Sequence, residues 1–68
     1  MNQVFTVGTA DGIAIVIASD EEEALQLAKA DELHGSFVRA ASKPEVAMIS
    51  PDKMPKGVCK WVSTRGIL

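Results

Sequence analysis

Residues 13–29 read IAIVIASDEEEALQLAK, six consecutive apolar residues followed by a serine, four acidic residues and a spaced pattern of Ala and Leu. The apolar run, residues 13–18, has the length of one strand and is apolar on both faces, which predicts a strand inside a sheet with a helix covering it. Ser19 marks the change to the helix, because its hydroxyl can accept a hydrogen bond from the N–H of Glu22 while the Glu22 carboxylate reaches back to the N–H of Ser19. The stretch therefore predicts one buried strand followed directly by a capped helix.

The predicted helix has an acidic first turn and a narrow apolar stripe. Residues 20–23 lie near the positive end of the helix dipole, which stabilises their carboxylates. Ala24, Leu27 and Ala28 follow helical spacing and predict close packing of small side chains on the sheet. Gly35, a residue type that readily takes positive φ, is expected to end the helix.

Four further strands are predicted from β-branched residues and from the turn residues between them. They are residues 3–9, 36–41, 46–50 and 58–64. The first is joined to the buried strand through Asp11 and Gly12, a pair typical of tight hairpins because both tolerate positive φ. The order ββαβββ with short connections predicts a single α+β domain, residues 1–68. It has two layers, an antiparallel β-sheet of about five strands with one α-helix packed on it.

The composition is that of a small globular protein, with 68 residues of which 47% are apolar. The longest apolar run is far shorter than the roughly 20 residues that span a bilayer, and the first residues lack the basic region of a signal peptide. Cys59 is the only cysteine, which excludes an intramolecular disulfide and a multi-cysteine zinc site. We therefore expect a cytoplasmic protein that does not associate with membranes.

The charges are divided between the two halves of the chain. Residues 1–34 hold seven acidic residues and one lysine, whereas residues 35–68 hold six basic and two acidic residues. This asymmetry predicts one acidic and one basic face, and such fields steer the association of proteins with charged partners.

No set of residues for catalysis can be assembled from the sequence. His34 and Cys59 are the only histidine and cysteine, they lie in different predicted elements, and no third residue is placed to orient them. The acidic residues of the helix are expected to be exposed and without a substrate pocket. The glycines of VGTADG lack the spacing of a phosphate-binding loop. We therefore predict that the protein is not an enzyme and uses no cofactor and no metal.

Three short motifs, SDEEEALQLA, HGSFVR and KWV, give the chain a family resemblance. It resembles the small phage-encoded type I-F anti-CRISPR proteins of ββαβββ build, over residues 19–39 and 60–62. The resemblance implies a non-enzymatic inhibitor that binds the type I CRISPR surveillance complex (Cascade) in the host cytoplasm and blocks binding of target DNA. Arg39, Lys60 and Trp61 match the family's motifs, whereas the helix is acidic where family members carry basic residues.

Two sets of residues are predicted to bind a partner. The acidic set is Glu23, Asp31 and Glu32, and the basic set is Arg39, Lys53, Lys56 and Lys60, together with Trp61. Asp31 and Glu32 lie at the end of the helix where the dipole disfavours carboxylates, so helix capping does not explain them. An acidic face could imitate nucleic-acid phosphates in a positive groove, and the basic half could instead hold an acidic patch or a bound nucleic acid.

Two alternative functions also fit the sequence. A small nucleic-acid-binding module could use Lys53, Lys56, Lys60 and Arg65 for phosphates and Trp61 for stacking a base, although Trp61 could equally close the small core. A homo-oligomeric phage structural or assembly protein, such as a homodimer, could use exposed edge strands for self-association.

Overall fold

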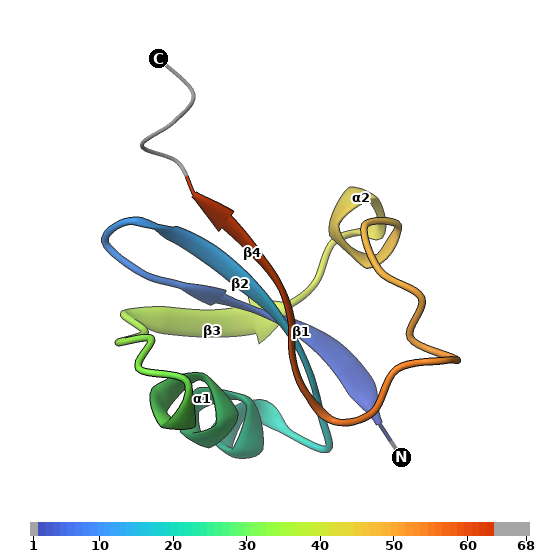
Figure 1. Cartoon of the computed structure of the whole chain (residues 1–68), viewed down its shortest axis with the longest axis horizontal. Coiled ribbons are helices and arrows are strands. Elements are labelled where there is room, and N and C mark those ends of the chain that lie inside the picture. Colours follow the sequence, from blue (N-terminus) through green and yellow to red (C-terminus); the bar gives the residue numbers. More distant parts are fainter. Residues whose placement is uncertain (1, 64–68) are drawn as a thin grey trace.

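The apolar run forms β2 (Gly12–Ala18), a central strand of a four-stranded antiparallel sheet (Figure 1). The computed structural model describes residues 2–63 of the chain. The other strands are β1 (Gln3–Gly8), β3 (Phe37–Ala40) and β4 (Gly57–Ser63), and the order across the sheet is β3-β1-β2-β4. The main helix is α1 (Glu21–Ala30), and a one-turn helix, α2 (Lys43–Val46), follows β3. The predicted α+β class, with an antiparallel sheet and one main helix, is confirmed.

The central strands β1 and β2 separate two buried layers, because side chains alternate along a strand. The first layer packs against Ala24 and Ala28 of α1, so the predicted alanine stripe does face the sheet. Its strand residues are Phe5, Val7, Ala14, Val16 and Ala18. The second layer contains Thr6, Ile15 and Ile17, which are also buried. Figure 1 shows α1 and α2 on opposite sides of the sheet, and a hydrogen bond from Thr6 to Glu45 joins α2 to the second layer.

The predicted strand at residues 46–50 is wrong, and the sheet has four strands instead of five. Residues 43–46 form α2, and turns follow it, so the element order is ββαβαβ. Ser42 and Glu45 start this short helix, since the Glu45 carboxylate accepts hydrogen bonds from the Ser42 N–H at 2.8 Å and from its hydroxyl at 2.9 Å. Local capping chemistry therefore prevails over the β-branched residues that favoured a strand.

The helix α1 begins one residue later than predicted. Asp20 is the N-cap and its carboxylate accepts the N–H of Glu23 at 2.8 Å, while the Glu23 carboxylate accepts the N–H of Ser19 at 2.7 Å. Side-chain capping is present with Asp20 and Glu23 in place of Ser19 and Glu22, but the glutamate accepts the N–H of Ser19, the residue before the N-cap, and not that of the N-cap itself. The predicted helix end at Gly35 is also wrong, because α1 ends at Ala30.

The predicted hairpin between residues 3–9 and 13–18 is present, but its turn differs from the prediction. The central turn residues are Ala10 and Asp11, and neither Asp11 nor Gly12 has positive φ. Thr9 organises the turn: its N–H donates to the Gly12 carbonyl at 2.8 Å, and its Oγ1 accepts the N–H groups of Asp11 and Gly12 at 3.3 and 3.2 Å.

The predicted strand at residues 58–64 corresponds to β4, although residue 64 lies outside the described range. A register shift interrupts the pairing of β4 with β2 between Ile15 and Val16. Within residues 2–63, neither helix has the length and apolar character needed to cross a membrane.

Candidate partner-binding surface

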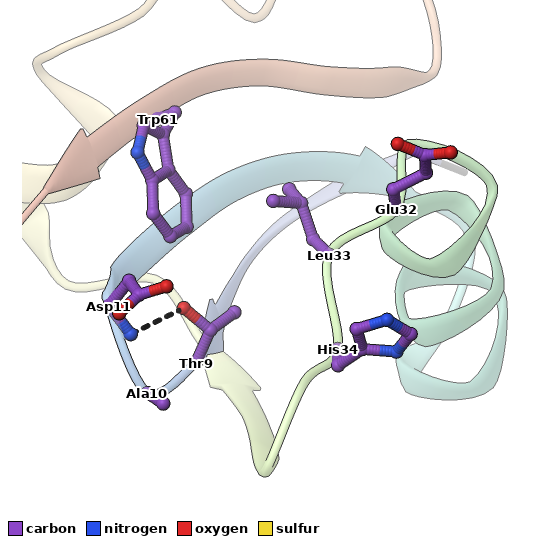
Figure 2. Close-up of a pocket in the computed structure, with 7 residues that line it drawn as sticks. All are labelled: Thr9, Ala10, Asp11, Glu32, Leu33, His34 and Trp61. Atoms are coloured by element: carbon purple, nitrogen blue, oxygen red, sulfur yellow. Dashed lines mark hydrogen bonds between the residues drawn. The ribbon is translucent and has the colours of Figure 1, made fainter.

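A surface hollow of about 210 Å³ lies between the end of α1, the β1–β2 turn and β4. We refer to it as the Trp61 hollow. Its lining residues are Thr9, Ala10, Asp11, Glu32, Leu33, His34 and Trp61. Figure 2 shows Trp61 on one side of the opening, Glu32 and His34 on the other, and Leu33 between them. Three separate parts of the chain thus line the hollow, and together they contribute an aromatic ring, an apolar floor and two carboxylates.

The helix-end wall of the hollow is built by the way α1 stops. The N–H of Glu32 donates to the Lys29 carbonyl at 2.9 Å and the N–H of Leu33 donates to the Ala28 carbonyl at 2.9 Å. This pair of bonds is a Schellman motif, whose pivot takes a left-handed conformation and is usually glycine. Here the pivot is Glu32, with φ of 63°. The turn directs the side chain of Leu33 towards β4, whereas the ring of His34 lies on the side of α1 (Figure 2).

The opposite wall comes from β4 and the hairpin turn. Trp61 pairs with Ala14 of β2, so its side chain lies on the face of the sheet that α1 covers. The hydrogen bonds of Thr9 fix the turn beside it, and Asp11 lies next to the indole (Figure 2). Trp61 keeps 38% of its surface exposed, so it closes the core only in part.

A second hollow, of about 230 Å³, adjoins the first. Its lining residues are Leu25, Lys29, Leu33, His34 and Gly35, and it therefore shares Leu33 and His34 with the Trp61 hollow. Leu25 is 37% exposed at this position. Two large apolar side chains, Trp61 and Leu25, thus line two hollows that have Leu33 and His34 in common.

Two of the predicted partner-binding residues bind each other. Lys56 Nζ lies 3.1 Å from Glu23 Oε1. The pKa of Glu23 is below its usual value, first because its carboxylate accepts the N–H of Ser19 and then because of Lys56. Glu23 therefore joins the start of α1 to the loop before β4, and this contact gives both side chains a structural role.

Arg39 also has a structural partner. Its guanidinium donates to both carboxylate oxygens of Glu45, each at 2.8 Å. This pairing is the largest cause of the low pKa of Glu45, about 2, and the hydrogen bonds from Ser42 and Thr6 contribute in the same direction. The pairing with Glu45 also raises the pKa of Arg39. Arg39 thus helps to hold α2 on the sheet, and about half of its side chain stays exposed.

The remaining predicted residues do not form one surface. Lys60 pairs with Ile15 and lies on the face of α2, whereas its neighbour Trp61 lies on the face of α1. Lys53 is in an exposed turn after α2, and Asp31 is the exposed C-cap residue of α1. Arg65 lies outside the described residues. Besides the ion pair of Glu23 and Lys56, the structure brings together Glu32 and Trp61 of the predicted set, which line the same hollow.

The sequence did not reveal the other residues that line the Trp61 hollow, above all Thr9, Asp11, Leu33 and His34. Asp11 is expected in a hairpin turn, and nothing in the spacing of Asp11 and His34 joins them to Trp61. The residues come together only through the antiparallel register of β1, β2 and β4 and through the left-handed turn at the end of α1.

No protein-family model, no curated protein and no solved structure matches this chain. The assignment of a function therefore depends on the site itself. Within residues 2–63, no group of three or more His, Cys, Asp and Glu side chains is placed to hold a metal ion. Burial raises the pKa of the Cys59 thiol, which disfavours the thiolate that a nucleophile or a metal ligand would need.

Proposed function

We propose that this chain is a non-enzymatic binding protein that acts by occupying a surface of a larger protein complex, and that the complex contacts the Trp61 hollow. The observation that carries this proposal is the exposure of Trp61 beside Leu33, with Leu25 exposed in the adjoining hollow. Tryptophan is enriched among the residues that dominate binding energy at protein interfaces. Neighbouring exposed apolar side chains on a small domain are typical of interaction surfaces.

The sequence resemblance supplies the partner for this proposal, a type I CRISPR surveillance complex whose binding of target DNA would be blocked. The electrostatics of the Trp61 hollow are compatible with it. Glu32 and Asp11 line the hollow, and exposed Asp31 lies beside it. Carboxylates around an apolar centre suit a basic groove that normally holds nucleic acid, and such an encounter is weakened by salt.

The test is a competition experiment with purified type I-F surveillance complex and labelled target DNA. The chain should bind the complex with fixed stoichiometry and should abolish DNA capture. Trp61→Ala should weaken binding at least tenfold, whereas Met48→Ala, which truncates another exposed apolar side chain, should leave binding unchanged. A complex that still captures DNA in the presence of excess chain contradicts the proposal.

The two alternative functions have less support. For a nucleic-acid-binding module, stacking of a base on Trp61 would bring phosphates close to Glu32 and Asp11, while Lys60 lies on the opposite face. For a homo-oligomer, β3 and β4 are the edge strands that could pair with a second copy. Titration with single-stranded DNA and RNA tests the first alternative, and the mass of the protein in solution tests the second.

A further inference from the structure

We propose that the Trp61 hollow binds the guanidinium of an arginine presented by the partner protein. This inference rests on the proposed function and names the chemistry of its central contact. The hollow, at about 210 Å³, is smaller than the roughly 300–1,000 Å³ of sites that bind cofactors and other small molecules. Its size suits a single side chain inserted from a partner.

The lining of the hollow combines the two groups that recognise a guanidinium. An arginine stacks on the face of an indole, and its planar fork of N–H groups matches the two oxygens of a carboxylate. Trp61 offers the ring, and Glu32 lies across the opening from it (Figure 2). Leu33, between them, can contact the apolar stem of the arginine side chain.

The carboxylate of Glu32 is available for this contact. Among residues 2–63, no side chain or backbone group forms a hydrogen bond or an ion pair with it, in contrast to Glu23 and Glu45, whose carboxylates are fully engaged. Glu32 also occupies the left-handed pivot of the Schellman motif, where glycine is the favoured residue. Helix termination alone favours glycine at this position, so it does not explain the acidic side chain at the rim of the hollow.

The negative charge of the lining indicates which kind of partner group can occupy the hollow. A phosphate or a carboxylate from a partner would meet the carboxylate of Glu32 at the rim of the hollow and be repelled. A lysine would satisfy the charge, but its compact ammonium lacks the planar face that stacks on an indole. Arginine is the side chain that uses both the ring and the carboxylate.

The intrinsic fluorescence of the chain provides the test, because Trp61 is the only tryptophan and the chain has no tyrosine. The chain is titrated with the blocked peptide acetyl-Gly-Arg-Gly-amide and with the same peptide carrying citrulline, a neutral isostere of arginine. The arginine peptide should change the Trp61 emission with saturation in the millimolar range, and the citrulline peptide should bind several-fold more weakly. A lysine peptide should also bind more weakly than arginine.

Glu32→Gln should lower the affinity for the arginine peptide about 3- to 10-fold, because it keeps the shape of the side chain and removes its charge. The matched control is Glu22→Gln, which neutralises an exposed carboxylate at the opposite end of α1 and should leave the affinity unchanged. Equal responses to arginine and citrulline, equal affinity for lysine, or equal effects of the two variants would each overturn the inference.

These outcomes separate the inference from the proposed function. A surveillance complex that binds wild type and Glu32→Gln equally well contradicts the arginine contact and leaves the proposed function standing. Binding of the arginine peptide by a chain that does not stop DNA capture contradicts the proposed function and leaves the arginine site standing.

Discussion

The hydroxyl of Thr6 in β1 donates a hydrogen bond of 2.9 Å to the carboxylate of Glu45 in α2, 39 residues further along the chain. Both residues are buried, and the same carboxylate also accepts hydrogen bonds from Arg39 and Ser42. One carboxylate therefore ties β1, β3 and α2 together on the face of the sheet that α1 does not cover. It is the polar centre of an otherwise apolar layer.

Removal of this carboxylate should destabilise the protein. Glu45→Ala leaves the buried Thr6 hydroxyl without its acceptor and should lower the free energy of unfolding by about 2 kcal/mol, measured by urea denaturation. Thr6→Val removes a single donor and should cost about 1 kcal/mol. Glu22→Ala, at an exposed position, should change stability by less than about 0.5 kcal/mol. Equal effects of Glu45→Ala and Glu22→Ala would show that the carboxylate does not hold α2.

The low pKa of Glu45, about 2 against an ordinary 4.5, predicts how stability depends on pH. Because the folded-state pKa is below the unfolded one, the stabilisation is fully present above about pH 4.5 and is lost as pH falls towards 2. Glu23, whose pKa is also lowered, acts in the same direction. The urea midpoint should therefore fall across this window, and Glu45→Gln should show a shallower fall. Parallel curves for wild type and variant would refute the prediction.

The parts of the fold that could be predicted are those determined by a continuous stretch of sequence. The run that is apolar on both faces predicts β2. The capping residues and the alanine stripe that follow it predict α1. The exact cap could not be chosen, because Ser19 and Asp20 are both good N-cap residues and each is followed three residues later by a glutamate. Residues 46–50 were predicted as a strand because their apolar residues favour one, while the partners of Glu45 that stabilise α2 are distant in the sequence.

The candidate site was less predictable for the same reason. Glu32 and Trp61 were predicted to bind a partner, but from separate arguments, one on helix charge and one on basic residues around an aromatic ring. Their proximity depends on the left-handed turn at Glu32 and on the register of β4 against β2. Neither is visible in local patterns, since glycine, not glutamate, is the usual signal for such a turn.

Alanine should have different effects at two glycines of the sheet, Gly12 in β2 and Gly8 in β1. A Cβ on Gly12 would lie 2.1 Å from the carbonyl oxygen of Val62, a backbone atom that cannot turn away. Gly12→Ala should therefore destabilise the protein by about 2 kcal/mol or more. A Cβ on Gly8 would meet the outer ring atoms of Phe37, which is half exposed and can move, so Gly8→Ala should cost less than about 1 kcal/mol. Thermal denaturation of both variants tests the order, and a larger loss for Gly8→Ala would contradict it.

Glycine in place of Glu32, the pivot of the Schellman motif, should make the protein more stable and weaken its binding of arginine. Glu32→Gly relieves the left-handed strain of a residue with a Cβ and should raise the free energy of unfolding by about 0.5–1 kcal/mol, with a rise of a few degrees in Tm. The same variant should lose the response to the arginine peptide. Asp31→Gly is the matched control: its φ of −95° is open to any residue, so glycine there should destabilise the protein. A loss of stability in Glu32→Gly would contradict this account of the pivot.

The carboxylates of the Trp61 hollow should also be detectable without any ligand, through quenching of the single tryptophan by charged and neutral solutes. Because the exposed Glu32 lines the same hollow as the partly exposed indole, we expect a negative local potential that concentrates caesium ions and repels iodide. The quenching constant of each solute is divided by its value for free indole. At low ionic strength this ratio should be highest for caesium, intermediate for neutral acrylamide and lowest for iodide. Glu32→Gln should reduce the difference between quenching by caesium and by iodide, and Glu22→Gln should leave it unchanged. Added salt should also reduce this difference, because the Debye length falls to about 10 Å at 0.1 M. Stronger quenching by iodide than by caesium would show that basic residues dominate the field around Trp61, and would favour the nucleic-acid-binding alternative.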